Sequence, residues 1–148
     1  MKLFLDTSAL IKAFHKEKGS DTIIKLLTND DVKIWISELT KIEYKSAIYR
    51  VFNNKQISKQ DLKTTLQSFD NYLKFININP LSSLTVSEAN SLFDKYYSFG
   101  LRSLDALQFA SFTLLLDTEI FFVTSDKKLE SIVKMSGFDV INPLTYNL

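Results

Sequence analysis

Cysteine is absent from the 148-residue sequence, and histidine occurs only once. A chain without thiols forms no disulfide bond and has no cysteine nucleophile. A single histidine cannot complete the usual nitrogen and sulfur shell of a tetrahedral zinc site. The three glycines also lie too far apart for a glycine-rich phosphate-binding loop. Cysteine-based sites, zinc sites of the usual type and phosphate loops are therefore excluded.

Long hydrophobic runs are missing as well. No stretch reaches the roughly 18 apolar residues that a membrane-spanning helix requires, and Asp6 falls where a signal peptide needs its apolar run. We therefore expect a cytoplasmic protein without a membrane partner. The 45% hydrophobic and 24% charged residues are typical of a globular protein, and the length predicts one domain over residues 1–148. The net charge of +1 says little about partners.

Short apolar segments alternate with segments of helical spacing along the whole chain. The expected strands are residues 3–5, 32–36, 75–78, 120–123 and 140–141. The expected helices are 8–15, one from 20, one capped by Ser37 and reaching 52, one from 58, one from about 87 to Gly100, one from 103, and 126–135. Strands that are apolar on both faces predict a mostly parallel sheet with helices on each side. The fold class is therefore three-layer α/β/α.

Two aspartates directly follow predicted strands. Asp6 comes after the first strand and Asp126 after the strand that ends at Val123, so both should lie at the carboxyl edge of the sheet, where ligands bind in such folds. Glu43 and Asp105 lie on predicted helices. Glu43 has no basic residue at helical spacing of three or four, so its carboxylate has no cation on its own helix.

Each of these acids also has a purely structural interpretation. Asp6 can cap a helix, Asp105 and Asp126 can interact with helix dipoles, and Glu43 can be a solvated surface charge. Taken together, four uncompensated carboxylates at one edge would repel one another. A hard divalent cation with oxygen ligands relieves such repulsion, and Mg²⁺ or Mn²⁺ suits this set best.

Four motifs then resemble the PIN domain family, in particular VapC-type toxins. They occur in the family's order and span nearly the whole chain. They are Leu5-Asp6-Thr7-Ser8-Ala9-Leu10, Ser37-Glu38-Leu39 leading to Glu43, Ser103-Leu104-Asp105-Ala106-Leu107-Gln108, and Val123-Thr124-Ser125-Asp126-Lys127-Lys128-Leu129. The ending, Val140-Ile141-Asn142-Pro143, resembles the family's closing strand. One departure is Gln108, which stands where many relatives have histidine.

The resemblance implies a Mg²⁺- or Mn²⁺-dependent endoribonuclease that is inhibited by a cognate antitoxin and forms a homodimer. The four matching acids would be the catalytic and metal-binding residues, Asp6, Glu43, Asp105 and Asp126. Thr7 and Thr124 match hydroxyl positions that orient the acids or contact water at the metal. Arg102 and Lys127, which are close to the motifs in sequence, are candidates for contacts with RNA phosphates.

Two other functions stay open at this point. One is a non-catalytic binding module on the same fold, because a fold does not guarantee activity. The other is phosphoryl transfer to Asp6, although the sequence lacks the second aspartate or the acidic pair that such enzymes use. Tyr44, Tyr49 and Phe52 share the helix of Glu43 and could line a groove for a second subunit or an antitoxin.

Overall fold

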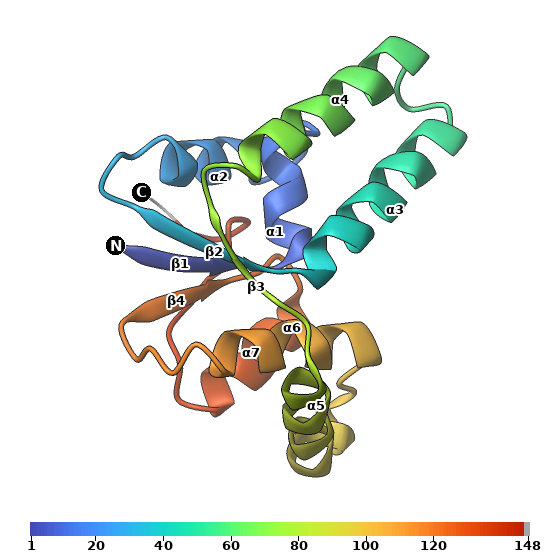
Figure 1. Ribbon diagram of the computed structural model, residues 1–148. Helices are drawn as coiled ribbons and strands as arrows, with labels where there is room; N and C mark the ends of the chain where they lie inside the picture. Colours follow the sequence, from blue (N-terminus) through green and yellow to red (C-terminus); the bar gives the residue numbers. More distant parts are fainter. Residues whose placement is uncertain (147–148) are drawn as a thin grey trace.

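A five-stranded sheet forms the centre of the computed structural model, which describes residues 1–146 (Figure 1). The strand order is β3-β2-β1-β4-β5, and every neighbouring pair is parallel. The strands are β1 (Lys2–Leu5), β2 (Lys33–Ser37), β3 (Asn77–Asn79), β4 (Ile120–Val123) and β5 (Val140–Ile141). This confirms the predicted α/β class and the parallel sheet.

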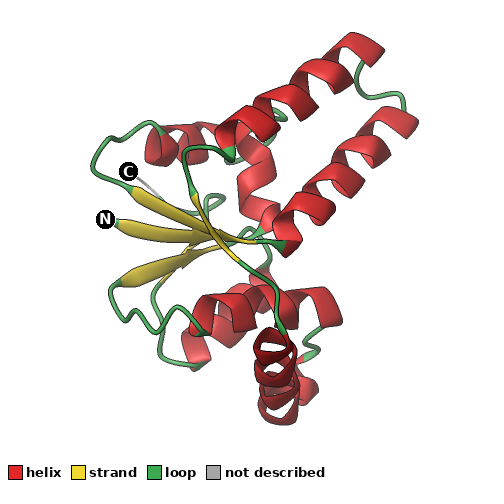
Figure 2. Cartoon of the chain, viewed as in Figure 1, coloured by secondary structure: helices red, strands yellow, loops and turns green. Residues whose placement is uncertain are grey.

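Helices connect the strands and cover both faces of the sheet (Figure 2). They are α1 (Thr7–Leu10), α2 (Ser20–Leu27), α3 (Leu39–Asn53), α4 (Lys59–Tyr72), α5 (Ser83–Tyr96), α6 (Ser103–Thr113) and α7 (Lys127–Met135), with short 3₁₀ helices η1 (Ile11–Ala13) and η2 (Tyr97–Phe99). Within residues 1–146, none of these helices has both the length and the apolar character needed to span a bilayer.

The core is divided by the sheet into two apolar clusters. Leu3 and Leu5 of β1 pack with α1 to α4, whereas Phe4, between them, packs with α5 to α7. Alternate side chains of a strand point to opposite faces, so a strand that is buried on both sides must be apolar throughout. Figure 1 shows the same division, with α1 to α4 over one face and α5 to α7 over the other. The three-layer prediction is confirmed.

Helices α3 and α4 form an antiparallel pair that extends beyond the sheet (Figure 1). A capping box opens α4: Ser58 Oγ accepts from the Asp61 backbone N–H, and Asp61 accepts from the Ser58 backbone N–H. Tyr44 stacks on Phe69 with ring centroids 3.7 Å apart. Tyr44 is a fully buried core residue, and it also lines the pocket between α3 and α4 together with Tyr49.

Three predicted boundaries are wrong. Helix α5 begins at Ser83, about one turn before the expected position. The prediction missed this first turn because Leu84 and Val86 are exposed there and do not follow the apolar spacing of the rest of the helix. Strand β3 is Asn77–Asn79 and excludes Phe75, which is 83% exposed. The helix expected at 8–15 ends its α-helical part at Leu10 and continues as η1.

We expect Phe109→Ala to reduce the free energy of unfolding by about 3–5 kcal/mol, because truncation of a fully buried aromatic ring removes apolar contacts and leaves a cavity. Phe75→Ala is the matched control and should change it by less than about 0.5 kcal/mol, since the Phe75 ring is exposed. Urea unfolding monitored by circular dichroism measures both. Equal losses in the two variants would contradict the described core.

Candidate functional site

The carboxyl ends of β1 and β4 lie side by side and place two predicted site residues next to each other. Leu5 pairs with Val123 at the end of the two strands. The backbone N–H of Asp6 then donates to the Val123 carbonyl at 3.0 Å. Asp6 and Thr124 therefore leave the sheet at the same edge, as the strand order predicts.

The carboxylate of Asp6 is buried and held by hydroxyl groups. Thr124 Oγ1 donates to Oδ2 at 2.6 Å, Ser8 Oγ donates to Oδ1 at 2.8 Å, and the Ala9 backbone N–H donates to Oδ1 at 2.9 Å. Burial raises the pKa of Asp6 to about 7, although these hydrogen bonds favour the charged form and act in the opposite direction. The bond from Ala9 makes Asp6 the N-cap of α1. Capping and a place in the site are therefore compatible roles.

Ser8 belongs to the site, and sequence reasoning missed it. Besides its bond to Asp6, Ser8 Oγ accepts from the Ser125 backbone N–H at 3.0 Å and lies 3.3 Å from Thr124 Oγ1. Ser8 thus ties the start of α1 to the loop after β4. The signal was available, because Ser8 is the third residue of the Asp6-Thr7-Ser8 segment that follows a strand.

Glu43 is oriented by side chains from two other elements. Thr7 Oγ1 donates to Glu43 Oε1 at 3.1 Å, and Gln108 Nε2 donates to the same oxygen at 2.6 Å. Burial raises the pKa of Glu43, and these two hydrogen bonds lower it in part. Sequence analysis expected no cation on the helix of Glu43, and the structure shows that neutral donors from α1 and α6 stabilise the carboxylate.

The side chain of Gln108 is buried and contacts several polar groups around Glu43. It is 2% exposed, and its Nε2 also lies within hydrogen-bond distance of the Thr7 and Thr40 hydroxyl oxygens, at 3.1 and 3.0 Å. Its Oε1 is buried and has no hydrogen-bond partner among residues 1–146. Gln108 therefore connects α6 to the starts of α1 and α3 and holds Glu43 Oε1 in place.

Asp105 lies at the electrostatic centre of the four acids. Partial burial raises the pKa of Asp105, and the charge of Asp126 raises it further. The charge of Asp105 in turn raises the pKa values of both Asp6 and Glu43. Contacts through neighbouring residues link these acids: Thr7, next to Asp6, donates to Glu43, and Arg102 contacts both Asp105 and Asp126.

Arg102 pairs with two of the acids, which corrects one expectation. Its Nε is 3.2 Å from Asp105 Oδ2, and its Nη2 is 3.4 Å from Asp126 Oδ2. The four carboxylates were expected to have no positive partner. This expectation is wrong for Asp105 and Asp126, because the guanidinium of Arg102, the residue before α6, pairs with both. Asp126 also caps α7, accepting from the backbone N–H of Lys128 at 2.8 Å and of Leu129 at 3.0 Å.

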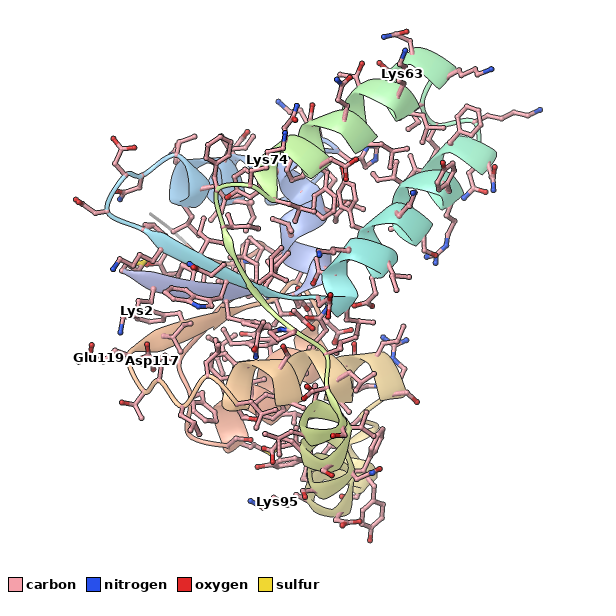
Figure 3. The ribbon with its side chains drawn as sticks, in the orientation of Figure 1. Lys2, Lys63, Lys74, Lys95, Asp117 and Glu119 are labelled. Carbon is pink, nitrogen blue, oxygen red and sulfur yellow. The ribbon has the colours of Figure 1, made fainter. Side chains whose placement is uncertain are left out.

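Other charged contacts lie away from this edge. Figure 3 shows Lys2 beside Asp117 and Glu119 at the amino end of the sheet, where Lys2 Nζ is 2.8 Å from Asp117 Oδ2. Asp6 and Thr124 lie at the opposite end of the same strands. The amino end of the sheet therefore does not contribute to the acidic site.

The donor chemistry of the site suits a divalent cation. Carboxylate and hydroxyl oxygens are the ligands that Mg²⁺ and Mn²⁺ prefer, and a bound cation would relieve the mutual repulsion of the four acids. Within the part of the chain that the structure describes, no three acidic or histidine side chains are gathered closely enough to form a ready metal shell. Asp105 and Asp126 both present Oδ2 to the same guanidinium.

Comparison with known families now bears on this arrangement. The PIN domain family model matches residues 3–134, which is most of the chain and includes all four acids. The chain belongs to the PIN domain family. The resemblance inferred from the four motifs is thereby confirmed.

Solved structures of other PIN proteins share the fold at low sequence identity. VapBC2 from Rickettsia felis, bound to a DNA fragment of its promoter, is 18% identical with a TM-score of 0.68 and covers 96% of this chain and 98% of that chain. VapC20 from Mycobacterium tuberculosis, described as a toxin that cleaves the sarcin–ricin loop, is 13% identical with a TM-score of 0.70 and covers 95% and 99%. FitAcB from Neisseria gonorrhoeae is 12% identical with a TM-score of 0.68 and covers 97% and 99%. No curated protein matched the sequence.

The raised pKa of Asp6 predicts a dependence of stability on pH. Folded Asp6 binds a proton more tightly than unfolded Asp6, so in chelator the free energy of unfolding should fall as pH rises from about 4 to about 7. Asp6→Asn removes the buried charge and should stabilise the PIN domain by about 1–3 kcal/mol at pH 8, with little difference at pH 5. Urea unfolding at both pH values measures this.

The exposed Asp94 of α5 provides the control, since Asp94→Asn should leave the profile of the wild type unchanged within about 0.5 kcal/mol. Mg²⁺ should reduce the difference in the free energy of unfolding between the wild type and Asp6→Asn. A ligand that binds only the folded state stabilises it, and the wild type keeps the Asp6 carboxylate that would bind the metal. Equal stability of the wild type and Asp6→Asn at pH 8 in chelator would show that the buried charge of Asp6 does not destabilise the fold.

Proposed function

We propose that this PIN domain is a Mg²⁺- or Mn²⁺-dependent endoribonuclease and the toxin of a toxin–antitoxin pair. The observation that supports this most strongly is the set of contacts that links the four acids: Thr7, the residue after Asp6, donates to Glu43, and Arg102 pairs with both Asp105 and Asp126. Buried acids that share a site are expensive for stability and are typical of metal-assisted phosphodiester hydrolysis. A similar solved structure, VapC20 from M. tuberculosis, is described as a toxin that cleaves the sarcin–ricin loop.

In this proposal Asp6, Asp105 and Asp126 hold the divalent cation directly or through water. The cation, when bound, supplies activation of water and neutralisation of the charge on the scissile phosphate. Thr124 orients Asp6 through its 2.6 Å hydrogen bond, which also keeps the buried carboxylate ionised more readily than burial alone would allow. Thr7 and Gln108 do the same for Glu43.

We assign the positioning of the attacking water to Glu43. The hydrogen bonds from Thr7 and Gln108 both end on Oε1, so the other oxygen, Oε2, is the one that would take a proton from water. The raised pKa of Glu43 brings its proton affinity closer to that required of a general base. Binding of a second cation by Glu43 is the other role that its oxygens allow.

Positive charge near the site favours a polyanionic substrate. The chain has 18 basic and 17 acidic residues, and four of the acids are those of the site. Outside the site, 18 basic residues stand against 13 acidic ones, an excess of about +5 that attracts RNA phosphates. We propose that Arg102, which is 70% exposed, and Lys127 at the start of α7 contact the phosphates beside the scissile bond.

A protein partner is also part of the proposal. A similar solved structure is described as a toxin–antitoxin complex from Klebsiella pneumoniae, and we propose that an antitoxin encoded beside this chain binds and inhibits it. We further propose a homodimer in the cytoplasm, where RNA is available. Tyr49 lines a groove of about 650 Å³ between α3 and α4, and this surface is a candidate for contact with a second protein.

Phosphoryl transfer to Asp6 is disfavoured because the segment Asp6-Thr7-Ser8 lacks the second aspartate that such phosphatases use and no acidic pair precedes it. The non-catalytic alternative is addressed by the experiment below.

Asp105→Asn should lower the rate of RNA cleavage at least about 100-fold, because it removes the acid that interacts with all three others. Asp94→Asn, an exposed acid on α5, should cleave like the wild type. The measurement uses purified protein with a pool of structured and single-stranded RNAs in Mg²⁺, in Mn²⁺ and in excess chelator. Cleavage by Asp105→Asn at the rate of the wild type, or in chelator, would contradict the nuclease mechanism, and no cleavage by the wild type would favour a binding module.

A further inference from the structure

Arg102 occupies a position between the two acids that open α6 and α7. It is the residue before α6, and it follows the turn at Gly100, whose φ of +76° ends η2. Its guanidinium contacts Asp105 through Nε at 3.2 Å and Asp126 through Nη2 at 3.4 Å. Both contacts are made to Oδ2 atoms, so a single planar cation bridges two carboxylates that belong to different helices.

This bridge is built to be reversible. The Arg102 side chain is 70% exposed, whereas those of Asp105 and Asp126 are 22% and 27% exposed. Ion pairs of an exposed arginine are weak because water and salt compete for both partners. Asp126 is held in place by two hydrogen bonds from the backbone of α7, whereas the guanidinium of Arg102 is exposed. Arg102 is therefore the partner that water and salt can most readily separate from the contact.

The geometry points to Arg102 as a resident counter-cation that competes with the divalent cation for Asp105 and Asp126 and, once displaced, binds the phosphate of the RNA. This inference rests on the proposed function and adds to it a residue with two alternative partners. In the metal-free chain Arg102 neutralises part of the acidic site. After metal binding, its five N–H donors are free for a phosphate, which arginine can bind through two parallel hydrogen bonds.

Lys128 is a matched control for charge without contact. Its charge lowers the pKa of Asp105, but no ion pair within 4 Å joins the two side chains in the described part of the chain. Its Nζ lies beside Gly100, at the approach to the same site. Replacement of Lys128 removes one positive charge from this neighbourhood and leaves the bridge between Asp105 and Asp126 intact.

The first test is isothermal titration of metal-free protein with MnCl₂, without RNA. Arg102→Gln should bind Mn²⁺ about three- to tenfold more tightly than the wild type, because two competing ion pairs are lost. Lys128→Gln should gain less than about twofold, since only a screened charge is removed. Equal gains in the two variants would mean that charge alone acts, and an unchanged or weaker affinity of Arg102→Gln would also overturn the inference.

The second test is the binding of a labelled single-stranded RNA oligonucleotide in a Glu43→Gln background, which blocks cleavage in the proposed mechanism. With Mn²⁺, Arg102→Gln should lose affinity and reduce the slope of log affinity against log salt by about one, as expected for one lost phosphate contact. In chelator the loss should be smaller, because Arg102 is then paired with the acids. An equal loss under both conditions would contradict the exchange of partners.

These outcomes separate the inference from the proposed function. A wild type that binds Mn²⁺ and cleaves RNA, with an Arg102→Gln variant that binds Mn²⁺ no more tightly, would overturn only the inference. A wild type that binds no Mn²⁺ would contradict the proposed function and the inference together.

Discussion

The burial of acidic side chains near the carboxyl edge of the sheet is the constraint on which the rest of this structure depends. Loss of water raises the pKa values of Asp6, Glu43 and Asp105 most, and the charges of Asp105 and Asp126 add smaller increases. A fold selected only for stability would separate such charges. Here the parallel pairing of β1 with β4 and the hydrogen bonds around Asp6 hold them at one edge. The PIN fold thus brings the acids close together, and hydrogen bonds from nearby polar groups stabilise their carboxylates.

The tolerance comes from three kinds of partner. Buried Asp6 is stabilised by hydroxyl groups and by the start of α1, whereas Glu43 relies on neutral donors from Thr7 and Gln108. Asp105 and Asp126, which are more exposed, share the guanidinium of Arg102. The protein therefore stabilises the carboxylate of buried Asp6 more strongly than those of Asp105 and Asp126. A metal ion can most easily replace the protein partner of the exposed pair, Asp105 and Asp126.

The sequence predicted the elements and the edge better than the contacts. Apolar strands and the aspartates that follow them are local patterns, so the positions of Asp6 and Asp126 could be derived from strand order alone. The hydrogen bonds to Glu43 could not, because Gln108 is 65 residues away in the sequence and reaches Glu43 only once the sheet has brought α3 and α6, which cover opposite faces, to the same edge. The bridge by Arg102 was missed for a related reason: its contact with Asp126 depends on how α6 and α7 meet. The spacing of charged residues along the sequence does not show the distances between residues of different helices.

The most direct test of the shared site is the titration of individual carboxyl groups by ¹³C NMR in metal-free protein. The account predicts that Asp6 titrates near pH 7, and that its pKa and that of Glu43 both fall in Asp105→Asn but not in Asp94→Asn. Such coupled shifts require Asp105 to lie within electrostatic reach of both groups. Titration of Asp6 near pH 4, with no response to the loss of Asp105, would contradict the account.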